Sequence, residues 1–320
     1  MLFRPRTVLT EVPPIRDDIQ RGNTTALTKR LTRRLTKRLP PVCVWIGALL
    51  VASFMPMHAL LPHACADQAV PVHSEGQSNA DGQSPSARRP VVAIMIGEPE
   101  YKTRETLPRF AAKNLQQDYD VVFVLEDSEN EGSFPEIDRI ATADVLVISV
   151  RRKTLPKSQL DVVRRFVAEG GSVVGIRTAN HAFCLRKGKS PPECDQWPQF
   201  DAEVFGGNYT GHYPNDQAST VCVAERSQDH RIVESMGVDC FEQIGSLYRT
   251  SPLADGAHVL LTGKLQSSDR EPFAAEPVAW TYTRPDGGHS FYTSLGHPAE
   301  FEKPAFERLL RGAIDWIVEQ

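Results

Sequence analysis

The segment SVVGIRTANHAF, residues 172–183, is the part of the sequence around which the rest is arranged. Its β-branched run passes through Gly175, turns through polar residues and resumes with helical spacing, which predicts a strand, a sharp turn and a helix. In an open α/β sheet such a turn lies at the carboxyl end of a central strand, where ligand crevices form. A nucleophile elbow uses the same geometry. Here the apex is Arg177, which stays protonated and only donates hydrogen bonds, so we expect recognition of an anion or a polar oxygen in place of nucleophilic attack.

Strands and helices alternate along the chain on both sides of this segment. Apolar runs rich in β-branched residues predict strands, and apolar residues at helical intervals predict helices. The expected strands are residues 91–96, 120–125, 144–150, 172–176, 220–224, 258–261, 278–283 and 289–293, and the expected helices are 104–117, 156–169, 197–205 and 304–318. The alternation implies right-handed crossovers, so we predict an α/β fold with a mostly parallel sheet covered on both faces.

The first 66 residues differ from the rest of the chain. Residues 1–66 contain ten Lys/Arg and three Asp/Glu, and the basic part is followed by an apolar run over residues 42–61 and then by Ala64-Cys65-Ala66. This order is typical of a secretory signal peptide. The apolar run reaches the roughly 20 residues that span a bilayer, so an uncleaved membrane anchor is the alternative. Either way we expect an extracytoplasmic protein, periplasmic or secreted, that meets the membrane only through this segment.

The remainder divides into a linker and one domain. Residues 67–90 are polar, contain Gly, Ser and Pro and lack aromatic side chains, so they predict a disordered linker. Residues 91–320 predict a single globular domain. Beyond residue 66 the chain carries 26 basic and 37 acidic residues, a net charge of −11. An acidic body lacks a basic face that would neutralise phosphates, so we expect no nucleic acid partner. The oligomeric state does not follow from the sequence.

Four cysteines lie in the expected domain. Outside the cytoplasm an even number favours disulfides, although four cysteines allow three connectivities. The pairs Cys184–Cys194 and Cys222–Cys240 would each close a short loop, and we expect these two. The alternative is a zinc site that includes His181, which the absence of a Cys-x-x-Cys pair disfavours.

Three later clusters contain side chains suited to ligand contact. In FGGNYTGH, glycines allow a tight loop to bring Tyr209 and His212 close to a ligand. A second cluster contains Tyr248, in LYR. The third contains Trp280, in PVAW, and His297, in SLGHP. Since His297 follows an expected strand and precedes an expected helix, it is placed on the same rim of the sheet as the turn in residues 172–183.

These clusters resemble the ThuA-like family, named for trehalose utilisation, over about residues 91–320. The most specific parts are the GG…GH run that ends at His212 and the segment 277–316, which reads PVAW, GG, FYTSLGH and AIDWI. The resemblance implies a flavodoxin-like three-layer sandwich with the class I glutamine amidotransferase-like fold. It also implies no amidotransferase activity and a link to carbohydrate metabolism.

Two positions depart from the pattern of that family. Arg177 stands at the apex where the family often has histidine, and His181 follows one helical turn later. Gly245-Ser246 stand where an Asp-Glu pair commonly precedes Leu-Tyr, so only Tyr248 carries over. The missing carboxylate weakens any general-base role at that position.

The leading hypothesis is an enzyme, a hydrolase, lyase or isomerase, that acts on a sugar or sugar derivative. His212 or His297 would transfer protons near neutral pH, and Arg177 would polarise a carbonyl or hold an anionic group. No cofactor is required. Three histidines that leave one position open form a catalytic zinc arrangement, so a divalent metal such as zinc is an open alternative. The expected substrate contacts are His181, Tyr209, Tyr248 and Trp280, and the candidate metal ligands are His181, His212 and His297.

The competing hypothesis is a non-catalytic module that binds a carbohydrate or another small molecule in the same crevice. A weaker one is a vestigial scaffold for protein contacts. Each site residue also has a structural interpretation: His212 and His297 could cap backbone groups, Trp280 could pack in the core, and Arg177 could form a salt bridge. Convergence of the histidines on Arg177 would favour chemistry. Scattered histidines with exposed aromatic rings in a groove would favour binding.

Overall fold

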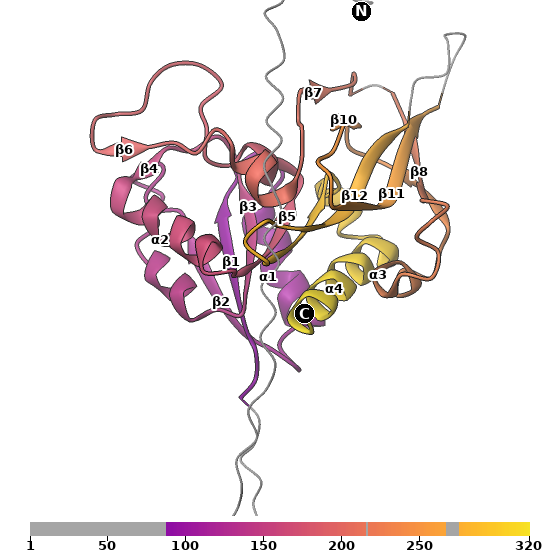
Figure 1. Ribbon diagram of the computed structural model, residues 1–320, viewed down its shortest axis with the longest axis horizontal. Helices are drawn as coiled ribbons and strands as arrows, with labels where there is room; N and C mark the ends of the chain where they lie inside the picture. The colour runs from indigo at the N-terminus through magenta and orange to yellow at the C-terminus, as the bar shows by residue number, and fades with distance from the viewer. Residues whose placement is uncertain (1–87, 216, 267–274) are drawn as a thin grey trace, which may run out of the picture. The chain divides into compact units, whose positions relative to one another are not determined.

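A nine-stranded sheet is the centre of the computed structural model, which describes residues 88–215, 217–266 and 275–320 (Figure 1). The strand order is β2-β1-β3-β5-β13-β12-β11-β8-β9. The strands are β1 Val91–Gly97, β2 Asp120–Leu125, β3 Val145–Val150, β5 Ser172–Ile176, β8 Ser219–Val223, β9 Cys240–Gln243, β11 Ala257–Leu265, β12 Glu276–Thr283 and β13 His289–Thr293. Two short ribbons lie outside the sheet: β4 Leu155–Pro156 with β6 Cys194–Asp195, and β7 Gly211–His212 with β10 Tyr248–Arg249.

This mixed sheet has a parallel central part of five strands, β2 to β13, and an antiparallel extension beyond β13. The pairs β2–β1, β1–β3, β3–β5 and β5–β13 are parallel, whereas β13–β12, β12–β11, β11–β8 and β8–β9 are antiparallel. All six side chains of β3 are buried, as a parallel strand covered on both faces requires. The chain moves from β1 outward to β2 and then back past β1 to β3. The strand order therefore reverses between β1 and β3, and a ligand crevice is expected beyond their carboxyl ends.

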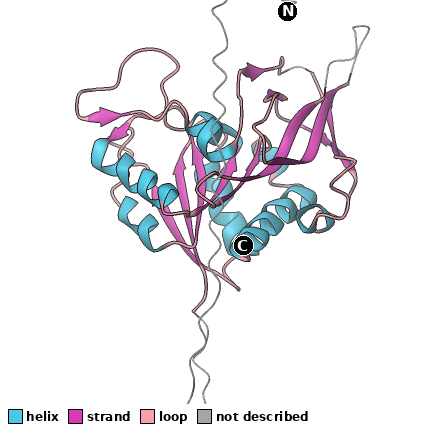
Figure 2. Ribbon diagram, in the orientation of Figure 1, coloured by secondary structure: helices cyan, strands magenta, loops and turns pink. Residues whose placement is uncertain are grey.

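Helices cover both faces of the sheet, which gives three layers (Figure 2). They are α1 Thr103–Asn114, α2 Lys157–Ala168, α3 Arg231–Glu234 and α4 Pro304–Val318, with the short turns η1 Ile137–Thr142, η2 Arg177–His181, η3 Asp201–Phe205 and η4 Pro298–Glu300. Side chains of α1 and α4, such as Phe110 and Leu309, pack in the core on one face. Leu160 and Val163 of α2 pack in a second core on the other. The predicted α/β fold with a mostly parallel central sheet is confirmed.

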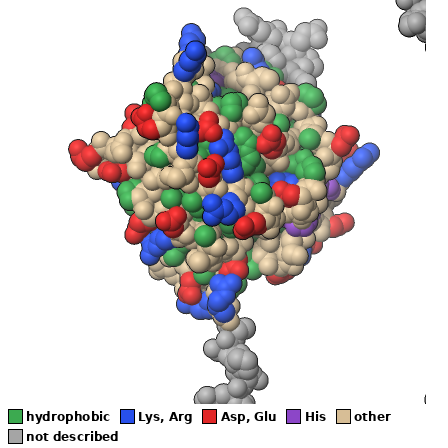
Figure 3. Space-filling view, turned by 60° about the vertical axis from the view of Figure 1, so that its left-hand side comes forward, with side chains coloured by type: hydrophobic (Ala, Val, Ile, Leu, Met, Phe, Trp, Pro, Cys, Tyr) green, Lys and Arg blue, Asp and Glu red, His purple; other side chains and the backbone are tan. Residues whose placement is uncertain are grey.

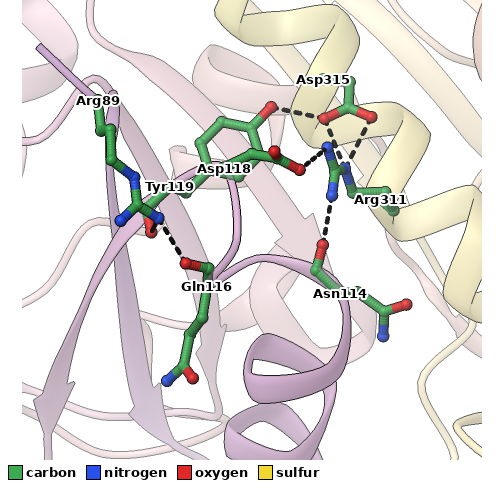
Figure 4. Close-up of polar contacts among 7 residues, drawn as sticks. All are labelled: Arg89, Asn114, Gln116, Asp118, Tyr119, Arg311 and Asp315. Carbon is green, nitrogen blue, oxygen red and sulfur yellow. Dashed lines mark hydrogen bonds and ion pairs between the residues drawn. The ribbon is translucent and has the colours of Figure 1, made fainter. Parts of the chain in front are cut away.

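The C-terminal helix α4 is fixed to the chain just after α1 by a polar network (Figure 4). Arg311 contacts the carboxylate of Asp315 one turn later at 2.7 Å and the carboxylate of Asp118 at 2.8 Å. It also donates to the carbonyl oxygen of Asn114, and the hydroxyl of Tyr119 donates to Asp315. These contacts hold α4 against the same face as α1, so the loop before α4 has a fixed place at the carboxyl ends of the strands.

The boundaries of the predicted strands and of the three longest helices match the sequence prediction closely, and the differences concern short elements. The expected helix over 197–205 is reduced to the π-helical turn η3, which ends at Gly206 with a left-handed φ of 61°. Strand β9, Cys240–Gln243, was not predicted. Elsewhere the ends move by only a few residues; the first helix, for example, ends at Asn114 rather than at residue 117.

One of the two expected disulfides forms. Cys222 and Cys240 lie opposite each other on β8 and β9 and are bonded. Cys184 and Cys194 are free thiols, so the predicted Cys184–Cys194 bond is wrong. The reason is that Cys194 lies in β6, where it pairs with β4, whereas the thiol of Cys184 faces the carbonyl oxygen of His181.

The surface of the domain carries both signs of charge. On the face shown in Figure 3, acidic and basic side chains lie beside one another. Among the ion pairs of the domain, Arg164 contacts Asp161 at 3.1 Å and Asp195 at 2.9 Å. Exposed pairs of this kind contribute less than about 1 kcal/mol each, so they do not determine the fold.

The N-terminal predictions concern residues that the structure does not describe. The basic leader, the apolar run over residues 42–61 and the linker up to residue 87 all lie outside the described ranges. Within those ranges, no helix is both long enough and apolar enough to cross a membrane.

Candidate functional site

The turn after β5 has the sharp geometry that the sequence predicts. Arg177 has a left-handed backbone, with φ 46°, and begins the single 3₁₀ turn η2 in place of a longer helix. For a residue with a side chain this conformation costs about 1–2 kcal/mol, and it persists only where the surroundings enforce it. Gly175 allows close packing beneath the turn, because a Cβ there would lie 2.4 Å from the ring of Phe205. The predicted apex at the carboxyl end of a central strand is confirmed.

The side chain of Arg177 is buried, with 2% of its surface exposed, and is held by the protein itself. Nη1 donates to the carbonyl oxygen of Ser294 at 2.8 Å, and Nη2 donates to the hydroxyl of Ser246 at 3.3 Å. The guanidinium carbon lies 4.3 Å from the ring centre of Tyr101 and 4.9 Å from that of Tyr248. No described carboxylate lies within ion-pair distance, and Nε has no partner. Arg177 thus joins the loops that follow β1, β5, β9 and β13.

A buried carboxylate orders two of those loops. Glu300, which is fully buried, accepts backbone N–H bonds from Gly296 at 2.6 Å and His297 at 2.9 Å through one oxygen. Its other oxygen accepts from Ile244 and Gly245, both at 3.3 Å. A charged acceptor shared by four backbone donors is strong. Glu300 therefore fixes the position of the chain on either side of the Arg177 guanidinium.

His181 lies beside this centre as a buried, neutral imidazole. Its Nδ1 is 2.5 Å from Oδ1 of Asn180, and its ring stacks on Tyr209 with centres 4.7 Å apart. The ring centre of Tyr248 is 6.4 Å away. Burial, followed by the positive charges of nearby arginines, of which Arg152 acts most, holds the pKa of His181 well below its usual value. The ring is therefore uncharged at neutral pH.

His212, in β7, is exposed at the edge of the site, and its ring centre lies 6.3 Å from that of Tyr248. Its Nδ1 is 2.8 Å from the carbonyl oxygen of Tyr213. Because a carbonyl oxygen only accepts, Nδ1 must carry the proton of the neutral ring. Nε2 of His212 is then the basic nitrogen.

His297 has the opposite tautomer. Its Nδ1 accepts the backbone N–H of Ala299 at 3.3 Å, so in the neutral ring Nε2 carries the proton. Its ring lies 6.2 Å from that of Tyr101. Burial lowers the pKa of His297, and Arg177 adds to this effect while Glu300 opposes it. His297 thus caps the turn η4 with one nitrogen and is a proton donor at the other.

A cavity of about 400 Å³ opens beside this cluster. The residues that line it are Arg152, Arg186, Tyr209, Thr210, Gly211 and His212. This volume lies in the range of small-molecule sites. Tyr209 forms part of the wall, and its ring stacks on the buried ring of His181.

Comparison with known proteins identifies the family of this chain. The family model described as ThuA, trehalose utilisation, matches residues 93–317. This chain belongs to the ThuA family. A ThuA-like protein from Bacteroides uniformis has a similar fold, with a TM-score of 0.52 and 18% identity over 74% of this chain and 94% of that one. A ThuA-like protein from Parabacteroides merdae matches with a TM-score of 0.47 and 15% identity over 72% and 90%. No curated protein matches.

The two departures from the ThuA family pattern are in contact with each other. A Cβ at Gly245 would lie 2.8 Å from both Nη atoms of Arg177, so a side chain at that position would displace the guanidinium. The hydroxyl of Ser246 accepts a hydrogen bond from the same group. An arginine at the apex therefore requires a small residue at position 245, and here Gly245-Ser246 provide the space and an acceptor.

Two predicted roles in this ThuA-family protein are wrong. Trp280 is 1% exposed, its Nε1 donates to the carbonyl oxygen of Phe205 at 2.7 Å, and its ring packs 4.6 Å from that of Tyr292. Because β12 is an inner strand of the sheet, the indole is core and no sugar ring can stack on it. Within the described ranges, no three His, Cys, Asp or Glu side chains form a group that could hold a metal ion. The zinc set of His181, His212 and His297 is therefore not formed.

Four residues at this site were not predicted from the sequence: Tyr101, Arg152, Arg186 and Glu300. For Arg152 a sequence signal existed, since RRK, residues 151–153, directly follows β3 and hence lies at the carboxyl edge of the sheet. Tyr101 similarly follows β1. Nothing in the sequence indicated Glu300, whose role depends on loops that come together only in the fold.

Proposed function

We propose that this ThuA-family protein is an enzyme that acts on a sugar or sugar derivative in the crevice that Arg152, Arg186, Tyr209 and His212 line, near the buried Arg177. The observation that carries the proposal is that two histidines each lie next to a tyrosine that flanks the same cation. His212 lies against Tyr248 and His297 against Tyr101, and these two tyrosines flank the guanidinium of Arg177. Sugar chemistry is proposed because the family is described by trehalose utilisation.

The tautomers of the two histidines suit proton transfer. Nε2 of His212, a cavity-lining residue, would take a proton from a sugar hydroxyl or from a carbon next to a carbonyl. Nε2–H of His297 would donate to an oxygen. The buried charge of Arg177 would stabilise negative charge that develops nearby. Hydrolysis, elimination and isomerisation all use such steps, and none of them needs a cofactor here. Amidotransfer is not proposed, because the apex residue is not a nucleophile.

One observation favours the second candidate function, a non-catalytic carbohydrate-binding module. The ring of His181 stacks on that of Tyr209, which lines the cavity, and the ring of Tyr248 lies 4.8 Å from Tyr209 at a tilt of 47°. Such a stack resembles a platform for a sugar ring. In addition, both Nη atoms of Arg177 are already bonded to the protein. In this alternative the same crevice binds a sugar and no proton is transferred.

The test is a turnover screen on the full-length protein with mono- and disaccharides and keto-sugars, followed by NMR of the products. His212→Ala should lower turnover by about 10²-fold or more and leave sugar affinity within about threefold. His230→Ala is the matched control, because His230 caps α3 and contacts His258, outside the crevice. Sugar binding without turnover by the wild type would establish the binding module instead. Neither binding nor turnover of any sugar would refute both.

We also propose that the protein is exported, with residues 1–66 as a signal peptide or, over residues 42–61, an anchor. The supporting structural feature is the disulfide between Cys222 and Cys240, since such bonds persist in oxidising compartments. Cell fractionation with mass spectrometry of the mature N-terminus tests this. A mature chain beginning after Ala66 indicates cleavage, an intact membrane-bound chain indicates anchoring, and an intact cytoplasmic chain contradicts export.

A further inference from the structure

Three cations with an unusual backbone lie along one edge of the sheet. In the part of the chain that the structure describes, the non-glycine residues with left-handed φ are Lys102, Arg152 and Arg177, at 53°, 53° and 46°. They follow β1, β3 and β5, which are neighbours in the sheet, so all three lie at the carboxyl ends. Left-handed residues with side chains cluster at functional sites, where the surroundings hold them in place.

Arg152 differs from the cations on either side of it. Nε of Arg151 contacts the carboxylate of Glu100 at 2.7 Å, and Nζ of Lys153 contacts Glu126 at 2.9 Å. Over the described ranges Arg152 makes no ion pair, and its Nε is buried without a hydrogen-bond partner. Its backbone N–H donates to the carbonyl oxygen of His181, which fixes it against η2. A buried guanidinium nitrogen without a partner is costly unless a ligand supplies an acceptor.

The cavity that Arg152 lines carries positive charge only. Arg186 contributes a second guanidinium, and none of the six lining residues has a carboxylate. The lowered pKa of the neighbouring His181, caused first by burial and then by four arginines, reflects the same positive field. A cavity walled by one sign of charge concentrates ligands of the opposite sign. Guanidinium groups match carboxylate and phosphate oxygens in pairs.

A second cavity along the same edge lacks these properties. It has a volume of about 470 Å³, and Lys102 and Lys153 line it together with Glu98, Glu126 and Glu131. Lys153 is paired with both Glu126 and Glu131. Its cations are thus accompanied by carboxylates, which would repel an anion. The contrast singles out the cavity at Arg152.

The geometry points to an anionic sugar as the ligand: a monosaccharide-sized molecule whose carboxylate or phosphate binds Arg152, with Arg186 as the second guanidinium of the cavity. This inference rests on the proposed function, because it takes the sugar part of the ligand from there. The oxyanion at Arg152 places the sugar ring on Tyr209 and its hydroxyls next to Nε2 of His212. The substrate on which His212 would act is therefore an anionic sugar.

The test is calorimetric titration of the full-length protein with four probes: glucuronate, glucose 6-phosphate, glucose and inorganic phosphate. We expect glucuronate or glucose 6-phosphate, which distinguish carboxylate from phosphate, to bind at least about tenfold more tightly than glucose. Arg152→Gln should weaken that binding by about 10- to 100-fold and abolish the preference, and Arg152→Lys should fall between. Lys102→Gln is the matched control, since it removes one cation with the same backbone conformation at the other cavity, and should leave affinity within about twofold.

Each other outcome has a defined meaning. Equal affinity for glucose and both anions, or an unchanged preference in Arg152→Gln, overturns the inference and leaves the sugar proposal standing. If inorganic phosphate binds as tightly as glucuronate or glucose 6-phosphate, and this binding depends on Arg152, the oxyanion site is supported but the sugar part of the ligand is contradicted. If neither glucuronate nor glucose 6-phosphate binds, the inference is overturned. Urea unfolding of each variant confirms that a lost affinity is not lost folding.

Discussion

Replacing Arg177 by methionine should destabilise the domain as well as disturb the crevice. The variant loses a charge-assisted hydrogen bond to Ser294, which contributes about 1.5–3 kcal/mol. It also loses the contacts of the guanidinium with the rings of Tyr101 and Tyr248, each of which contributes up to about 2 kcal/mol when buried. Removing a desolvated charge offsets part of this loss. We therefore expect a net decrease of about 2–4 kcal/mol in the free energy of unfolding.

The assay is urea unfolding of the full-length protein at neutral pH, followed by circular dichroism, with the stability taken from the midpoint at constant slope. Arg177→Lys retains the charge but cannot donate to Ser294 and Ser246 in a fork, so it should lose roughly half as much. Arg186→Met, an exposed arginine of the same crevice, should change stability by less than about 0.5 kcal/mol. An Arg177→Met variant as stable as the wild type would refute the view that this side chain joins the surrounding loops.

Four further predictions use the same unfolding assay. The pKa of His181 is depressed in the fold, so the stability that it contributes is present above its unfolded pKa of about 6.5 and is lost as the pH falls below that value. His181→Gln should therefore flatten the decline in the free energy of unfolding from pH 7 to 5. Parallel curves of stability against pH for the variant and the wild type would contradict this. Burial raises the pKa of Asp201 to about 7, so the stability that this residue contributes is full below about pH 4 and is lost as the pH rises through 7. The stability of Asp201→Asn should therefore increase relative to the wild type between pH 5 and 8. A difference in stability that does not change with pH would exclude this linkage. Trp280→Phe should cost about 1–3 kcal/mol through lost volume and a lost hydrogen bond, without affecting sugar binding; weaker binding would restore a ligand role. Cys222→Ala should cost about 3 kcal/mol and Cys184→Ala less than about 1, and equal losses would contradict the observed pairing.

The sequence was most informative where local chemistry and the fold agree. The β-branched run that passes through Gly175 and the polar turn that begins at Arg177 place a strand end at this residue, although the helix expected after the turn is only the short turn η2. The amphipathic spacing of α4, with Leu309 and Ile314 facing inward, likewise follows from sequence alone. In these segments a single residue pattern is compatible with only one face toward the core.

Predictions failed where the outcome depends on which way a side chain points. Helices cover both faces of the sheet, so the sequence around Trp280 does not show whether the ring packs in the core or reaches a crevice. Proximity in sequence suggested Cys184–Cys194, but a disulfide needs matched Cα and Cβ positions, and the β4–β6 pairing places Cys194 elsewhere. Arg152 and Tyr101 each follow a predicted strand, but the sequence does not show which loop side chains at the strand ends face the site.

The most direct test of the account is a crystal structure of the protein with its sugar ligand, chosen from the binding assays. We expect electron density for the ligand in the cavity between Arg152 and Tyr209, with a ligand oxygen within hydrogen-bond distance of Nε2 of His212. A ligand bound in the other cavity, beside Glu98 and Lys153, with the cavity at Arg152 empty, would contradict this expectation.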